Sequence, residues 1–115
     1  MTFLTINLPH WFETELQQSL PEPLCTVKNL SQALLVIAVR DFSCIIVDVR
    51  QLDCASKNLA ELLAETAPGT KIIGLGSEST VPDPDYWRAQ GISLLFETDS
   101  ARLIKMVIEH CANAH

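Results

Sequence analysis

Short apolar runs alternate with amphipathic segments along the whole chain. The runs contain many β-branched residues, which is typical of strands inside a parallel sheet. They predict five strands, at Phe3–Leu8, Leu24–Val27, Cys44–Val47, Lys71–Leu75 and Ile92–Phe96.

The segments between these runs carry apolar residues at helical spacing and begin with residues that cap helices well. They predict helices over His10–Leu20, from a cap at Asn29 or Ser31 to about Arg40, over Ser56–Thr66, near Asp85–Ala89, and from a cap at Asp99 or Ser100 to Cys111. Five consecutive β–α units with short connections predict a parallel sheet, with right-handed crossovers and helices on both faces.

The stretch Ser43–Arg50 is the centre of the predicted fold. Its apolar part, Cys44–Val47, has the pattern of a strand buried on both faces, and a carboxylate follows at once at Asp48. Sites in open parallel sheets lie at the carboxyl ends of the strands, where the backbone leaves the sheet. Asp48 is therefore either a functional acid or a structural carboxylate that accepts loop N–H groups or pairs with Arg50 or Lys71.

Composition narrows the class of protein. The chain has 115 residues, of which 48% are hydrophobic, so we expect a single globular domain over residues 1–115. The net charge of −6, with scattered basic residues, argues against nucleic-acid binding. The longest apolar stretch, Ala33–Val39, is too short to span a membrane, and Met1–Leu4 lacks the basic segment of a signal peptide. The cysteine spacing fits no metal site, and reduced thiols in a cytoplasmic protein are the expectation.

The order of elements, with an Asp closing the third strand, resembles the receiver domain of bacterial response regulators. The local similarity is highest over Cys44–Leu63 and over Lys71–Leu75. The resemblance implies an α/β fold, a flavodoxin-like (βα)5 three-layer sandwich whose five-stranded parallel sheet has the order 2-1-3-4-5. It also implies that Asp48 occupies the phosphoacceptor position.

The residues around that position depart from the receiver pattern. Receivers carry two acids after the first strand to hold Mg²⁺, and this chain has Asn7-Leu8-Pro9-His10 there. Gly76, followed by Ser77, stands where receivers have a Thr or Ser, and Glu97-Thr98-Asp99 stands where they end the fifth strand with a Lys. The resemblance thus implies a degenerate pocket, formed by Asn7, Gly76, Ser77, Glu97 and Thr98 around Asp48. We expect no cofactor, with Mg²⁺ needed only if Asp48 is a working phosphoacceptor.

Two segments are candidates for an interface. In the second predicted helix, one side can cover the sheet, with Leu34, Ile37 and Ala38 on it and Ala33 at its edge. The opposite side is also apolar and predicts an exposed strip for a dimer or partner contact, formed by Leu35, Val36 and Val39. In the fourth helix, the neighbours Tyr86 and Trp87 cannot both face the core, so we expect one of them to be at least partly exposed. The resemblance places this helix on the face that receivers use for partners.

The sequence favours a non-enzymatic, receiver-like signalling module in a cytoplasmic two-component-type regulator. We expect it to act through a protein partner or a homodimer, without conventional Mg²⁺-dependent phosphorylation, and to be compatible with a fused output domain in a longer protein. One alternative is a genuine receiver of a phosphorelay, phosphorylated on Asp48. Another is an anti-sigma-antagonist-like regulatory domain, because Asp53–Ser56 is similar to the Asp-Ser-Ser-Gly segment of those proteins.

Overall fold

The computed structural model describes residues 2–20, 22–48, 69–76 and 84–112, together with Glu61, Ala64 and Glu65. Its elements follow one another as β1 (Thr2–Ile6), α1 (His10–Ser19), β2 (Leu24–Val27), α2 (Leu30–Val39), β3 (Phe42–Asp48), β4 (Lys71–Leu75), α4 (Pro84–Ala89), β5 (Ile92–Leu95) and α5 (Ser100–Ala112). The helix predicted at Ser56–Thr66 lies outside the described residues, apart from three helical positions at Glu61, Ala64 and Glu65.

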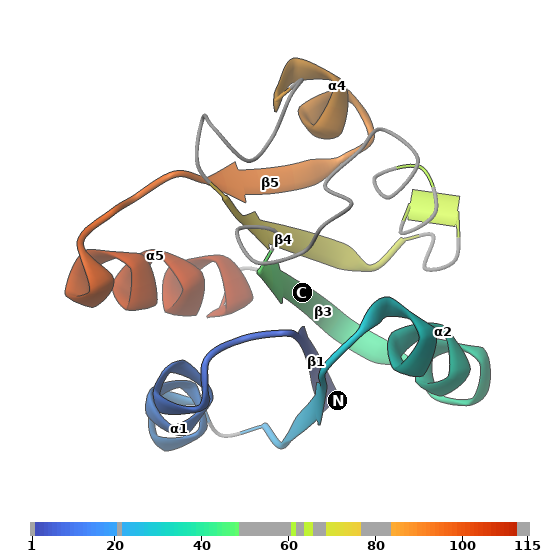
Figure 1. The fold of residues 1–115 in the computed structure, drawn as a ribbon, viewed down its shortest axis with the longest axis horizontal. Helices are drawn as coiled ribbons and strands as arrows, with labels where there is room; N and C mark the ends of the chain where they lie inside the picture. Colours follow the sequence, from blue (N-terminus) through green and yellow to red (C-terminus); the bar gives the residue numbers. More distant parts are fainter. Residues whose placement is uncertain are drawn as a thin grey trace.

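All strand pairs in the sheet are parallel, and the strand order is β2-β1-β3-β4-β5. Helices α1 and α5 lie together on one side of the sheet, and α2 lies on the other (Figure 1). This is the flavodoxin-like three-layer arrangement with the order 2-1-3-4-5, and the predicted fold class is confirmed. Within the described residues, no helix combines the length and the apolar character needed to cross a membrane.

The core consists of two clusters, one on each face of the sheet, because side chains alternate between the faces along a strand. Ile45 and Val47 of β3 belong to the cluster that contains Ala33 of α2 and Trp87 of α4. Cys44 and Ile46 belong to the cluster under α1 and α5. All seven residues of β3 are buried, as the apolar run predicts for a central strand.

One thiol contact joins α5 to this central strand. The sulfur of Cys111 lies 3.9 Å from that of Cys44, and both residues are buried. The hydrogen bond from Cys111 and the burial of the site raise the pKa of the Cys44 thiol well above its usual range. Cys44 therefore stays protonated and packs as a small apolar residue.

The first strand ends earlier than the sequence predicts. It stops at Ile6 rather than at Leu8, because Asn7 has a positive φ of 60° and turns the chain out of the sheet. Asparagine is one of the residues that tolerate this left-handed conformation. Its backbone N–H still donates to the carbonyl of Val27, over 2.9 Å, so the turn is fixed at the end of β2.

Candidate functional site

The carboxyl ends of the strands bring several predicted site residues to one edge of the sheet. Ile6 pairs with Val47, so Asn7 follows β1 alongside Asp48. Asp48 itself pairs with Leu75, after which β4 ends and Gly76 follows. The structure thus brings Asn7, Asp48 and Gly76 to neighbouring positions, as the sequence predicts for the carboxyl edge of a parallel sheet.

Asp48 is fully buried, with 0% of its surface exposed. By alternation along β3 its side chain belongs to the face covered by α1 and α5. The strand register disfavours pairing with Lys71, one of the alternatives for Asp48, because Lys71 lies opposite Cys44 at the other end of the strand pair. Four residues of strand separate it from the position of Asp48, a span of about 13 Å. The other predicted partner, Arg50, lies outside the described residues.

The end of β1 contributes no carboxylate to this edge. Asn7 offers an amide, and Leu8 turns into the core beneath α1 and α5. The part of the chain that the structure describes contains no group of three His, Cys, Asp or Glu residues able to hold a metal ion. Mg²⁺ is held by carboxylates in near-octahedral geometry, and one carboxylate beside one amide is a poor donor set for it. The described residues at this edge therefore do not fit Mg²⁺.

The residues after β5 are used in local structure. The Glu97 carboxylate accepts the backbone N–H of Asp99 at 3.1 Å and lies 3.9 Å from the Arg102 guanidinium. The Asp99 carboxylate accepts the N–H groups of Ala101 and Arg102, at 3.0 and 3.3 Å, and so caps α5, as the sequence predicts. These contacts stabilise the start of α5. Glu97 and Asp99 also bring negative charge to a position where phosphoryl transfer would need a cation.

Of the remaining predicted pocket residues, Gly76 is buried and its N–H donates to the carbonyl of Leu95 at 3.1 Å. Its backbone donor is thus held between β4 and β5. Thr98 is exposed, and Ser77 lies outside the described residues.

No protein-family model matches the chain, and no curated protein matches it either. Solved structures do match. The Francisella response regulator 1452 receiver domain aligns with a TM-score of 0.76 at 14% identity, over 99% of this chain and 98% of that one. The beryllofluoride-activated dimer of the NtrC4 receiver domain, a protein from Aquifex aeolicus, aligns with a TM-score of 0.75 at 19% identity, over 99% and 98%. The chain has the receiver-domain fold.

A third similar structure belongs to a protein named as an enzyme. The adenylate cyclase from Rhodopirellula baltica aligns with a TM-score of 0.74 at 18% identity, over 98% of this chain and 87% of that one. At these identities the likeness shows the receiver fold alone.

Helix α2 is rotated about its own axis relative to the orientation that the sequence predicts. Leu35 and Val39 are exposed as predicted, at 73% and 79%, but Val36 is half-buried and packs against the core. Ala38, which we expected over the sheet, is exposed, and Ala33 takes the buried position. An apolar pattern on both sides of a helix cannot specify this rotation.

The prediction of Trp87 as an interface residue is also wrong. Trp87 is fully buried in the cluster beneath α2 and α4, so it is not an interface residue in this structure. Its neighbour Tyr86 is half-buried, which confirms that one of the two rings is partly exposed; it packs against the same cluster, and its hydroxyl donates to the Glu61 carboxylate. The larger and more apolar ring takes the interior position because it buries more surface.

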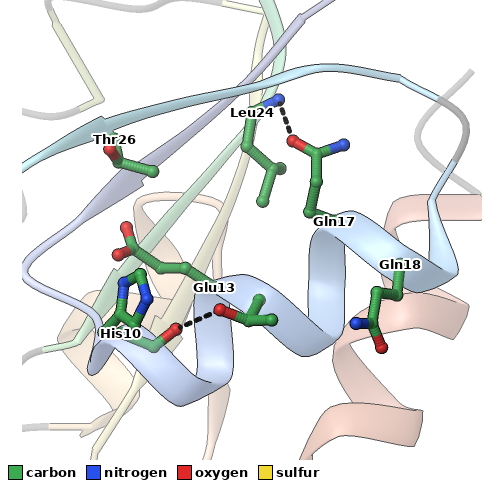
Figure 2. A pocket seen from close by; sticks show the side chains of 7 residues that line it. His10, Glu13, Gln17, Gln18, Leu24 and Thr26 are labelled. Atoms are coloured by element: carbon green, nitrogen blue, oxygen red, sulfur yellow. Dashed lines mark hydrogen bonds between the residues drawn. The ribbon is translucent and has the colours of Figure 1, made fainter.

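Sequence reasoning missed a groove between α1 and β2. It encloses about 290 Å³ and is lined by His10, Glu13, Thr14, Gln17, Gln18, Leu24 and Thr26 (Figure 2). Three of its polar side chains are already engaged. Gln17 accepts the N–H of Leu24 at 3.2 Å, Glu13 accepts the buried hydroxyl of Thr5 at 2.8 Å, and the Thr14 hydroxyl donates to the carbonyl of His10 at 3.0 Å. The groove is open to solvent and is formed where a helix packs beside an edge strand, a contact for which the sequence has no local signal.

Proposed function

We propose that the chain is a cytoplasmic receiver-like signalling module that acts by protein–protein interaction, without conventional Mg²⁺-dependent phosphorylation. It has no enzymatic role in this proposal. It is a regulatory domain of a bacterial two-component-type system, alone or joined to an output domain.

The observation that carries the proposal is the composition of the carboxyl edge. The resemblance to receivers assigns Asp48 the phosphoacceptor position, and the residue beside it at the end of β1 is the amide Asn7. After β5 the edge has Glu97, whose nearest described cation is Arg102 at 3.9 Å. Phosphoryl transfer depends on cations that neutralise the developing charge, and an edge with acids in their place disfavours it.

Interaction through a surface is supported by α2. Its outer side exposes Leu35 and Val39, which lie one helical turn apart and offer a partner adjacent apolar area. The similar NtrC4 receiver domain is a dimer in its beryllofluoride-activated form. Association is therefore a mode of action that the fold accommodates.

A second candidate is a working receiver phosphorylated on Asp48. The position of Asp48 at the end of the central strand favours it, and the full burial of this residue counts against ready access by a phosphodonor. The anti-sigma-antagonist-like alternative depends on Asp53–Ser56, which lies outside the described residues. The all-parallel β–α order lends it no support.

Treatment with a small phosphodonor and Mg²⁺ separates the two candidates. We expect the intact mass of the wild-type chain to remain unchanged after incubation with acetyl phosphate and millimolar Mg²⁺. The Asp48→Asn variant is the matched control, and a receiver with a complete pocket shows that the donor is active. A phosphoryl adduct on the wild-type chain that Asp48→Asn abolishes would establish the second candidate instead.

A further inference from the structure

Helix α2 has an outer surface without charge. None of its ten residues is charged, and among residues 31–39 the exposed positions are Ser31, Gln32, Leu35, Ala38 and Val39. The whole chain carries a net charge of −6, so two copies repel one another over most of their surface. At the uncharged α2 surface this repulsion is weak, and apolar side chains are available for contact with a second copy.

Opposite charges flank this surface. Lys28 precedes the helix and Asp41 follows it, and both are exposed. Among the described residues neither has an ion-pair partner. Arg40 is turned away, because its guanidinium donates to the Thr2 hydroxyl at 3.5 Å and lies 5.6 Å from the centre of the Phe42 ring.

The spacing of these charges is self-complementary. Lys28 lies seven residues before Leu35 and Asp41 lies six after it, so the two charges are nearly equidistant from the middle of the helix. A two-fold axis near Leu35 sets two α2 helices antiparallel, and Lys28 of each copy then meets Asp41 of the other. A parallel arrangement would bring like charges together.

The side chains between the two charges fit the same arrangement. Around that axis Leu35 packs against its own copy, and Ser31 lies opposite Ala38 of the second copy. Both of these residues are small, so the helices can approach closely. The antiparallel alignment also sets the positive end of each helix beside the negative end of the other.

We propose that α2 is a homodimer surface, with an antiparallel α2–α2 contact centred on Leu35 and flanked by two Lys28–Asp41 pairs. The inference rests on the proposed function, since it names the partner as a second copy of this chain. A single pair of short helices buries less area than the roughly 1,200 Å² of a standard stable interface. The dimer is therefore weak and reversible, with a dissociation constant in the micromolar range.

Sedimentation velocity from low micromolar to near-millimolar protein measures this association. We expect a concentration-dependent dimer for the wild-type chain and a monomer for Leu35→Asp combined with Val39→Asp. Both side chains are largely exposed, so the variant should keep its fold, which its circular dichroism and melting curve check. A wild-type chain that is monomeric at every concentration would overturn the proposal, and so would a dimer unaffected by the double substitution.

A charge exchange tests the antiparallel geometry. Lys28→Asp and Asp41→Lys should each weaken the dimer by about tenfold, because each makes both flanking contacts repulsive. The double variant restores opposite charges and should recover the wild-type constant. Matched controls on α5 are Lys105→Asp and Glu109→Lys, which change the net charge equally and should leave association unchanged. Failure of the double variant to recover would refute the antiparallel contact. None of these outcomes depends on phosphorylation, so they are separable from the test of the proposed function.

Discussion

Trp87 is the largest fully buried side chain in the described part of the fold, and its indole N–H has no hydrogen-bond partner there. An orphaned donor of this kind costs about 1–3 kcal/mol, which the burial of the ring has to outweigh. The residue lies in the same cluster as Ile92 and Leu94 of β5, so it holds α4 against the edge of the sheet. Its role is packing rather than recognition.

If Trp87 is a packing residue, two substitutions should lower the free energy of unfolding by different amounts. Trp87→Ala should lower the free energy of unfolding by about 3–5 kcal/mol, because it leaves a large cavity. Trp87→Phe should cost less, about 1–2 kcal/mol, since it keeps most of the ring and removes the orphaned donor. Urea unfolding curves measure both values.

Trp11→Phe is the matched control, because Trp11 is 48% exposed and its replacement should change stability by less than about 0.5 kcal/mol. If Trp87→Ala were as mild as Trp11→Phe, Trp87 would not be a core residue.

At the scale of elements, α2 is held by a reciprocal pair of contacts at its start. The Asn29 side chain accepts the N–H of Gln32 at 2.9 Å, and the Gln32 side chain accepts the N–H of Lys28 at 3.0 Å. This is close to a capping box, in which two backbone donors at a helix start are satisfied by the side chains of one turn. The contacts fix where α2 begins, although its apolar pattern leaves the rotation ambiguous.

We expect Asn29→Ala to lower the free energy of unfolding by about 1 kcal/mol, since it removes the cap, whereas Asn29→Asp should retain most of it. Thermal melts of both variants against the wild-type chain measure the difference. Ser31→Ala is the control, because Ser31 was the other capping candidate in the sequence and is an exposed residue of the first turn. A larger loss for Ser31→Ala than for Asn29→Ala would contradict this assignment of the cap.

The rotation of α2 shows where sequence reasoning fails within an element. Leu35 and Val39 could be placed outside from the helical wheel, but Val36 and Ala38 could not be distinguished, because both sides of the helix are apolar. The rotation is set by packing against the sheet, where Ala33 takes the fully buried position. Such a preference depends on the partner surface, which no local pattern contains.

For the whole molecule, the sheet order and the carboxyl-edge site could be predicted from the sequence. Short β-branched runs separated by amphipathic helices leave few topologies, and the position of Asp48 at the end of β3 follows from them. The sequence left open whether Asp48 pairs with Lys71, and the register of β3 on β4 disfavours this pairing because it separates the two residues. The groove between α1 and β2 and the burial of Trp87 were also missed, since both arise from packing between distant segments.

The central claim is that this receiver fold lacks the Mg²⁺ site on which receiver phosphorylation depends. The most direct test is a Mg²⁺ titration followed through the amide resonances around Asp48. We expect no saturable shift up to millimolar Mg²⁺ for the wild-type chain, and weak saturable binding for Asn7→Asp, which restores one acid beside Asp48 in a conformation that Asp also tolerates. A saturable shift of the wild-type resonances that Asp48→Asn removes would contradict the account.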